Sequence, residues 1–237
     1  KTAYEIRLSL VGSEMCIETA VHYSEIARFS GAKVIGVNNN AYQIQRSNIL
    51  NKRCGLEHLC STKQSDFMNL PFAPESIDAA YAMEATCHAP DKAACFAQIY
   101  KALKPGALFA GFDWVMTDKY DATNAEHNKI KHDIEHGDSL PNLPAANVVD
   151  QSLVKAGFEV VTAFDMSTHA QKNGQSVGWH ETLKGGYSLS QIKHSSMGRM
   201  FTQRMVDVME FCRVAPKGTS ETHRMLCTAA DALARGM

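Results

Sequence analysis

Short apolar runs alternate with amphipathic stretches along the first half of the chain, and this alternation limits the possible folds more than any other feature. The run at 33–37 (KVIGV) is rich in β-branched residues and follows Gly31 and Ala32, and similar runs occur at 77–85 and 107–116. Helix-like segments separate them at 38–55 and 91–106. Apolar strands joined by helical crossovers are typical of a parallel sheet. We therefore expect an α/β fold built from βαβ units.

Further elements follow from the same periods and turn signals. The polar stretch 117–144 interrupts the alternation and ends in a proline-rich turn, and a long polar loop is expected at 167–186. The remaining expected elements are strands at 56–66 and 158–166 and helices at 20–31, 145–157, 190–214 and 220–237.

Composition limits the classes of protein to which the chain can belong. A net charge of -1 over 237 residues argues against broad binding of a phosphate backbone, which needs clustered Lys and Arg. We therefore expect no nucleic-acid partner. The seven cysteines include no C-x-x-C pair and are expected to be buried thiols in a reducing compartment. No apolar run approaches the length of a membrane span, and the first residues lack the pattern of a signal peptide.

Several motifs along the chain are similar to those of one enzyme family. They are NNNAYQ (38–43), SDFMNLPF (65–72), EATCHAP (84–90), LKPG (103–106) and DWVMTDKYD (113–121), followed later by APKG and AADAL. On these residues the chain resembles the sterol 24-C-methyltransferases from about Ser24 to its end. The resemblance implies a Rossmann-like class I methyltransferase core, a mainly helical C-terminal subdomain, and S-adenosylmethionine as the cofactor.

The first residues depart from the family pattern. The family carries a glycine-rich cofactor loop just before the segment that matches IARF (26–29), whereas this chain has RLSLVGSEMCIETAVHY there. SLVGSEMCI (9–17) looks like a translated sequencing adapter, so residues 1–23 are expected to be non-native, with a divergent first strand and turn as the alternative. The family's last strand has no counterpart after Met237. We therefore expect a chain truncated at both ends, with little or no turnover of its own.

The expected domain organisation also follows from the resemblance. Residues 24–165 form the methyltransferase core, in which 117–145 are an insertion that covers the substrate. Residues 166–237 form the sterol methyltransferase C-terminal subdomain.

Polar residues at the end of the second expected strand are candidates for binding the cofactor's ribose. Asn38 stands where methyltransferases usually have an acid that accepts hydrogen bonds from the ribose hydroxyls. An asparagine accepts through its oxygen and donates through its nitrogen, and Gln43 lies one turn further on and faces the same way. A simple helix cap formed by residues 38–40 is the alternative.

Asp66 ends the third expected strand. The resemblance implies that its carboxylate accepts a hydrogen bond from the adenine amine, with a backbone donor at Phe67 beside it. A loop aspartate without a ligand is the alternative, and the LPF that follows favours the cofactor role. The expected cofactor-binding residues are Asn38, Asn39, Gln43, Asp66, Phe67, Met83 and Glu84.

Sterol methylation places the reacting groups just past the fourth and fifth expected strands. The side-chain alkene attacks the methyl carbon of the sulfonium, and the resulting tertiary carbocation undergoes a hydride shift and then loses a proton. Aromatic faces stabilise such a cation, and a carboxylate or a histidine takes the proton. The candidate catalytic residues are Glu84, His88, Asp113 and Tyr120. The candidate substrate-binding residues are Cys87, Phe112, Trp114 and Trp179, with membership of the core as the alternative for each aromatic ring.

Three further segments have alternative interpretations. HDIEH (132–136) matches the H-x-x-E-H pattern of a zinc hydrolase, in which His132 and His136 share a helix face, but it needs a third ligand and we expect no metal. APKGTSETHRM (215–225) is either a phosphate-binding turn or a loop that supports the subdomain. The methionine-rich helix expected at 190–214 lines a lipid pocket or belongs to an ordinary core.

The function that we favour at this stage is methylation of a sterol side chain at carbon 24. The alternatives are a methyltransferase for another lipid or small molecule, a lipid-binding remnant without cofactor affinity, and the zinc hydrolase. The expected partner is a sterol substrate, and peripheral association with a membrane and with a second copy of the chain are also considered. The expected location is the cytoplasmic face of the endoplasmic reticulum or another sterol-synthesising membrane.

Overall fold

The computed structural model describes residues 13–17, 22–166, 169 and 196–236. Contacts between Cα atoms divide the chain into two compact units. The first unit combines Lys1–Val115 with Pro144–Val160, and the second combines Met116–Leu143 with Val161–Met237.

The first unit is built on a five-stranded sheet in which all neighbouring strands are parallel, in the order β3-β2-β1-β4-β5. This arrangement confirms the expected α/β fold with a parallel sheet. The strands are β1 (Ser13–Ile17), β2 (Lys33–Asn38), β3 (Cys60–Gln64), β4 (Ile77–Met83) and β5 (Leu103–Phe112).

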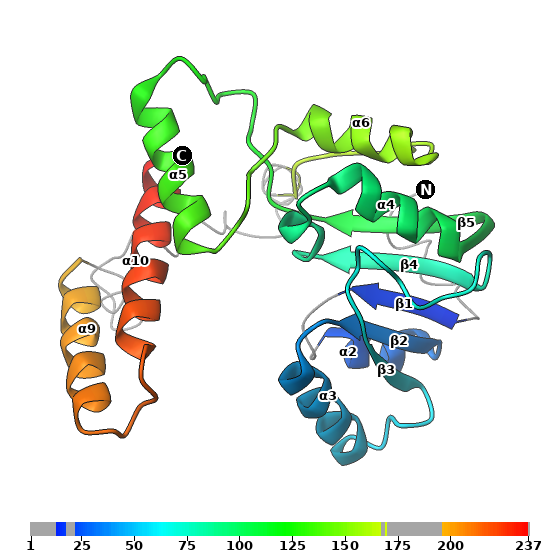
Figure 1. Ribbon diagram of the computed structural model, residues 1–237, viewed down its shortest axis with the longest axis horizontal. Coiled ribbons are helices and arrows are strands. Elements are labelled where there is room, and N and C mark those ends of the chain that lie inside the picture. Colours follow the sequence, from blue (N-terminus) through cyan, green and yellow to red (C-terminus); the bar gives the residue numbers. More distant parts are fainter. Residues whose placement is uncertain (1–12, 18–21, 167–168, 170–195, 237) are drawn as a thin grey trace. The chain divides into compact units, whose positions relative to one another are not determined.

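Helices connect these strands, and their ends follow from local chemistry. Asn40 caps α3, because its side-chain oxygen accepts from the amides of Tyr42 and Gln43, and Asp91 caps α4 in the same way. Figure 1 shows α4 beside β5 and α6 beside α4, whereas α2 and α3 lie beside β2 and β3. The helices of this unit are α2 (His22–Ser30), α3 (Ala41–Arg53), the short 3-10 helix η1 (Thr86–His88), α4 (Lys92–Ala102) and α6 (Ala146–Ala156).

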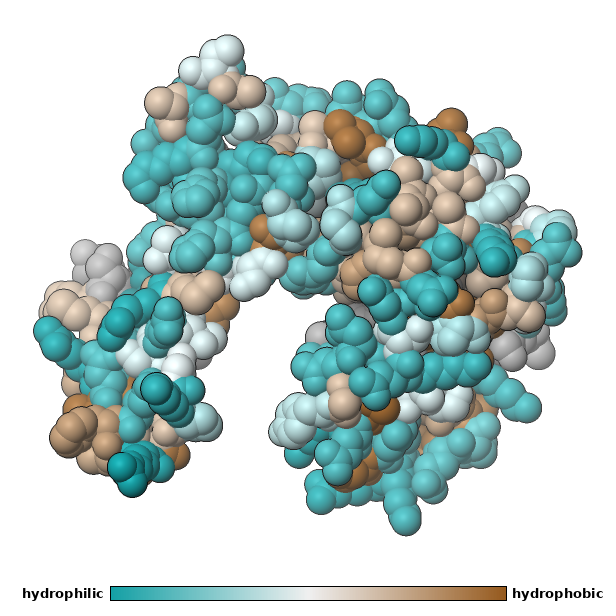
Figure 2. Space-filling view, viewed as in Figure 1, coloured by the Kyte–Doolittle hydropathy of each residue, from teal (hydrophilic) through white to brown (hydrophobic). Residues whose placement is uncertain are grey.

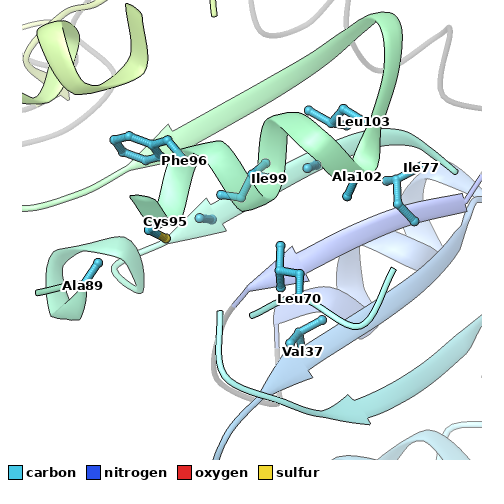
Figure 3. Packing of buried hydrophobic residues seen from close by; sticks show 11 residues of the cluster. Val37, Leu70, Ile77, Ala89, Cys95, Phe96, Ile99, Ala102 and Leu103 are labelled. Atoms are coloured by element: carbon cyan, nitrogen blue, oxygen red, sulfur yellow. The ribbon is translucent and has the colours of Figure 1, made fainter. Parts of the chain in front are cut away.

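Both faces of the sheet are covered by apolar packing. On one face, Val37 of β2 belongs to a buried cluster with Phe96 and Ile99 of α4. Figure 3 shows this cluster. Val34 of β2 belongs to a second cluster with Ala27 of α2. Because successive side chains of a strand point to opposite faces, the two clusters lie on opposite sides of the sheet, as in a doubly wound fold.

The central strand of the sheet comes from the segment that departs from the family pattern. Residues 1–23 are expected from the sequence to lie outside the fold, whereas the structure places β1 between β2 and β4. The backbone of Glu14 is in register with Val34 on one side and with Ala79 on the other. Part of the segment 1–23 therefore belongs to the sheet, and its origin stays a prediction.

The strand expected at 158–166 is wrong, because the structure assigns no strand to these residues. Phe158 instead packs edge-on against Tyr100 of α4, with ring centroids 5.1 Å apart. Further along, Val161 is 81% exposed and Phe164 is 52% exposed. The apolar residues of this segment therefore have no neighbouring strand in the described part of the chain.

The cysteines only partly follow the expectation of buried thiols. Cys60, Cys87 and Cys95 are buried and free, as expected. Cys54 and Cys212 are exposed, so the expectation is wrong for these two.

The second unit contains three described helices of appreciable length: α5 (Ala125–Gly137), α9 (Ser196–Phe211) and α10 (Thr219–Arg235). By its contacts, most of the expected insertion at 117–145 belongs to this unit rather than to the sheet-containing unit. Arg235 of α10 donates to Asp133 of α5 over 2.6 Å, which links the two helices. Among the described residues, no helix is long and apolar enough to cross a membrane.

Gly137 sets the distance between α5 and α10. A Cβ atom at this position would lie 2.5 Å from the Cβ of Ala229 and 2.7 Å from the carbonyl oxygen of Met225. Such contacts require the backbone of α10 to move. We expect Gly137→Ala to lower the free energy of unfolding of this unit by about 1–3 kcal/mol, the usual cost of overpacking. Urea unfolding followed by circular dichroism, with hydrogen exchange of α5 and α10 amides, measures the loss.

His132→Ala on the exposed side of α5 is the matched control, because it changes the helix without adding bulk at the interface. Equal stability of Gly137→Ala and the control would show that α5 and α10 are not packed at this distance.

Candidate active site

The carboxyl ends of the parallel strands meet at one edge of the sheet, and this edge collects most of the residues singled out from the sequence. Asn38 ends β2 in register with Gln64 at the end of β3. Met83 ends β4 in register with Phe112 at the end of β5. In open parallel α/β sheets, ligands bind at this edge. The candidate site of the first unit therefore lies there.

Both the nitrogen and the oxygen of the Asn38 side-chain amide form hydrogen bonds. Its nitrogen donates to Oε1 of Gln43, and its oxygen accepts from the backbone amide of Asn40 at 2.8 Å. Gln43 therefore faces Asn38, as expected from its place one turn into α3. The cap of α3 is provided by Asn40, so Asn38 is not the capping residue. The amide pair at 38 and 43 is held in a fixed orientation at the end of β2.

Asp66 lies two residues beyond the end of β3, in a tight turn. Its Oδ1 accepts from the amide of Met68 at 2.8 Å, and its carbonyl oxygen accepts from the amide of Asn69 at 2.9 Å. The side chain is exposed, so its other oxygen is open to an external donor. Phe67 and Met68 pack against the core cluster of α4. The turn thus fixes the carboxylate while its backbone is attached to the core.

Glu84 follows β4 with an unusual backbone. Its φ is 50°, in the left-handed region that non-glycine residues rarely adopt. Its amide donates to the carbonyl oxygen of Phe112 at 2.7 Å, which continues the β4–β5 pairing by one residue. Such backbone outliers cluster at functional sites. The side chain of Glu84 is exposed at the edge of the sheet.

A buried polar group joins the ends of β4 and β5. Thr86 of η1 is 2% exposed, and its hydroxyl donates to Oδ2 of Asp113 in a short hydrogen bond. Nζ of Lys92 donates to the carbonyl oxygen of Thr86 at 2.9 Å. Oδ1 of Asp113 is buried without a hydrogen-bond partner. The side chains therefore leave one carboxylate oxygen of Asp113 available inside the protein.

Burial dominates the acid–base behaviour of this group. Desolvation raises the pKa of Asp113 above its ordinary value of 3.8, although the hydrogen bond from Thr86, the charge of Lys92 and hydrogen bonding from Cys87 oppose the shift. Desolvation also raises the pKa of Cys87 to about 12. The Cys87 thiol is therefore protonated at neutral pH, which agrees with its interpretation as a buried thiol and not a nucleophile.

The remaining candidate residues differ in their exposure and in the part of the chain to which they belong. His88 is exposed at the end of η1, and Phe112 is 43% exposed at the end of β5. Trp114 is half-buried just after Asp113. Tyr120 belongs to the second unit, where its hydroxyl donates to Asn128 at 2.7 Å. Trp179 lies outside the described residues.

Two site residues were not singled out from the sequence. Thr86 lies inside the EATCHAP motif, but nothing in the motif shows that its hydroxyl reaches a residue 27 positions away. Lys92 is the first residue of α4 and looks like an ordinary surface lysine. The only available signal was their position in the sequence: Thr86 lies between Glu84 and His88, and Lys92 follows His88 by four residues.

The HDIEH segment does not form a metal site in the described residues. His132 and His136 stack on α5 with ring centroids 6.2 Å apart, and both are exposed. No group of three His, Cys, Asp or Glu residues in the described ranges could hold a metal ion.

Comparison with known proteins defines the class of the first unit. A family model described as "Methyltransferase domain" matches residues 19–111. Geranyl diphosphate C-methyltransferase from Streptomyces coelicolor has a similar structure, with a TM-score of 0.60 over 69% of this chain and 62% of that chain, at 15% identity. The sheet order and this match define a class I methyltransferase fold.

The second unit and the closer relatives give the family. A model described as "Sterol methyltransferase C-terminal" matches residues 189–237. Cycloartenol-C-24-methyltransferase of Arabidopsis thaliana is 44% identical over 90% of this chain, and sterol 24-C-methyltransferase of Saccharomyces cerevisiae is 40% identical over 90%. The chain belongs to the sterol 24-C-methyltransferase family. It spans 62% and 56% of the lengths of these two relatives.

Asp113→Asn tests the buried carboxyl through the pH dependence of stability. Because the folded pKa is raised, the stability contributed by protonated Asp113 is present below the ordinary pKa and is lost as pH rises through the folded pKa. Asparagine keeps an oxygen for Thr86 and does not ionise. The free energy of unfolding of the variant, relative to the unchanged chain, should therefore rise as the pH increases above the ordinary carboxyl pKa of 3.8.

Urea unfolding at several pH values measures this difference, with Asp118→Asn at an exposed position as the control. A difference that stays constant over the range would mean that Asp113 ionises as freely in the folded chain as in the unfolded one.

Proposed function

We propose that the protein transfers a methyl group from S-adenosylmethionine to the side-chain alkene of a sterol at carbon 24. The observation that supports this most directly is the identity of 44% to a cycloartenol-C-24-methyltransferase, because it extends over 90% of the chain. The identity therefore includes both the strand ends of the candidate site and the C-terminal helices. The fold alone would not specify a substrate, since one fold supports many activities.

The strand-end residues fit the polar groups of S-adenosylmethionine, which supplies a methyl group on a positively charged sulfur. The free oxygen of Asp66 would accept from the adenine amine, while the amide of Met68 holds the other oxygen. The fixed amide pair of Asn38 and Gln43 would face the ribose hydroxyls. The residues Asn39, Phe67, Met83 and Glu84 complete the proposed cofactor contacts.

Asp113 is the residue that we favour for taking the proton from the sterol cation. A general base needs a pKa near the working pH, and burial moves the pKa of Asp113 in that direction. Its Oδ1 has no hydrogen-bond partner, whereas Oδ2 is held by Thr86. Glu84 and His88 are exposed and remain candidates for the same step.

Two aromatic residues adjacent to Asp113 in the sequence also belong to the proposal. Phe112 precedes Asp113 and Trp114 follows it, so the chain places both rings within one residue of the base. Their faces would stabilise the carbocation before the proton leaves. Cys87 would contribute apolar surface, and Tyr120 and Trp179 are the further candidates for contact with the sterol.

The proposal extends to the setting of the reaction. A sterol is an apolar molecule that resides in bilayers, so we place the activity at the cytoplasmic face of the endoplasmic reticulum or another sterol-synthesising membrane. Peripheral attachment to that membrane and association of two copies of the chain are parts of the same proposal.

Asp66→Asn tests the adenine contact without removing the turn. The retained side-chain oxygen still accepts from Met68, but the free oxygen becomes an amide nitrogen that donates and therefore opposes the adenine amine. We expect binding of S-adenosylmethionine to weaken by about 1–3 kcal/mol, or roughly 5-fold to 150-fold in Kd. Calorimetric titration measures this in a chimera whose residues 1–23 are replaced by the matching segment of the Arabidopsis relative.

Glu57→Ala is the matched control, because Glu57 is an exposed acid that precedes β3 at the other edge of the sheet. Equal affinities of Asp66→Asn and Glu57→Ala would exclude a contact between Asp66 and adenine.

Transfer of a labelled methyl group tests the activity itself. With a sterol that carries a side-chain alkene at carbon 24, we expect the chimera to produce labelled sterol, and the same sterol with a saturated side chain to remain unlabelled. Asp113→Asn should lower the rate by about 10²-fold or more, the usual contribution of a general base. The chain with its present residues 1–23 should show little or no transfer, because they replace the glycine-rich loop of the family.

Mass spectrometry of the extracted sterol measures the product. A chimera that binds S-adenosylmethionine but leaves the alkene sterol unlabelled would contradict the proposed substrate, and label in the saturated sterol would contradict the proposed chemistry.

A further inference from the structure

Helix α9 uses its polar side to contact α10. Nε2 of Gln203 donates to Oγ of Ser220 at 2.9 Å, and the same hydroxyl donates to Asp207 in a short hydrogen bond. On the next turn, the carboxylate of Glu210 accepts from the amides of Gly218 and Ser220 at 2.9 Å and 2.7 Å. The side of α9 that faces its neighbour is therefore hydrogen-bonded rather than apolar.

A different side of α9 is apolar and exposed. Met197 is 77% exposed, Phe201 is 73%, Val208 is 61% and Phe211 is 88%. Their spacing places them on one side of a helix of 3.6 residues per turn. We call these four residues the outer face of α9. Figure 2 shows hydrophobic side chains at the surface where α9 lies in Figure 1.

The acidic and basic residues of α9 are divided between the same two sides of the helix. The two acids of this segment, Asp207 and Glu210, are held by hydrogen bonds to α10 and to its first residues. Arg204 lies between Phe201 and Val208 on the outer face, and it forms no ion pair with any described residue. Two further exposed cations, Arg213 and Lys217, follow α9 and have no such partner either.

We propose that the outer face of α9 binds the surface of an anionic lipid bilayer. The face is the side of a single helix and presents flexible methionine and phenylalanine side chains, which suit fluid acyl chains. Its cations would meet anionic headgroups, each contributing attraction near the surface. A monomeric soluble protein rarely exposes a contiguous apolar surface of this kind without a partner.

The inference rests on the proposed function in one respect, because a sterol substrate gives this protein a reason to lie on a bilayer. The lipid contact can nevertheless be measured without sterol and without S-adenosylmethionine. Loss of methyl transfer and loss of bilayer binding are therefore separate results.

Sedimentation with sterol-free vesicles tests the contact in the chain as it exists. We expect the chain to bind vesicles of phosphatidylcholine with phosphatidylserine, to bind vesicles of phosphatidylcholine alone more weakly, and to release from the former as salt rises. Replacing Phe201 and Val208 together by Asp should lower binding by at least about 10-fold, since charged groups oppose entry into the apolar layer. Arg204→Gln should lower binding by about 5-fold on the anionic vesicles only.

Val154→Asp is the matched control, because Val154 is 60% exposed on α6 in the other unit and should not alter binding. Arg204→Gln removes charge without changing the apolar surface, so it keeps the test valid if the double variant folds poorly. Failure of the unchanged chain to bind either vesicle would overturn the proposal.

Two further outcomes would assign the outer face to another occupant and also overturn the proposal. If the chain is a dimer by light scattering and the double variant is a monomer with unchanged vesicle binding, the face joins two copies. If the double variant binds vesicles normally but unfolds at a clearly lower temperature, the face is covered by another part of the same chain.

Discussion

All five strands of the sheet run in the same direction, and this constraint determines where the chemistry of the first unit lies. Parallel strands bring their carboxyl ends to a single edge, so residues that are far apart in sequence become neighbours there. Asn38 ends β2, whereas Asp66, Thr86 and Asp113 follow β3, β4 and β5, and all four are gathered in this way. The apolar clusters on both faces keep the strands in register, and the polar edge depends on that packing.

The hydrogen bond between Thr86 and Asp113 shows how the candidate site depends on the stability of the fold around it. It joins η1 to the residue that follows β5, and Lys92 supports it through the carbonyl of Thr86. The same burial that raises the pKa of Asp113 makes its charged form unfavourable for folding. The surrounding core therefore keeps the Asp113 carboxyl group buried, although its charged form does not stabilise the fold.

Local signals were sufficient for much of the fold and for part of the site. The β-branched run before Asn38, the cap at Asn40 and the position of Asp66 are all consequences of nearby residues, and a sequence contains these directly. The pairing of Thr86 with Asp113 is a contact across two strands, which no local pattern encodes. The strand expected at 158–166 failed for the opposite reason: its apolar residues are present locally, but no neighbouring strand in the described part of the chain pairs with it. β1 was left out of the expected fold because SLVGSEMCI (9–17) looks like a translated sequencing adapter and stands where the family has its glycine-rich loop.

Helix α9 is amphipathic, but its polar side contacts α10 and its apolar side is exposed. An amphipathic pattern therefore does not by itself identify a core. Glu210 occupies the amides at the start of α10, which is the place that a phosphate would need if APKGTSETHRM were a phosphate-binding turn. Hydrogen bonds to those amides hold the pKa of Glu210 below its ordinary value, so its charge is retained where the helix begins. Because the acids and amides of this hairpin satisfy one another, the contact between α9 and α10 does not need the apolar side of α9. That side and its cations, which form no ion pair with a described residue, are consequently left for a surface that is both apolar and negatively charged, and a bilayer that contains anionic lipid has both properties.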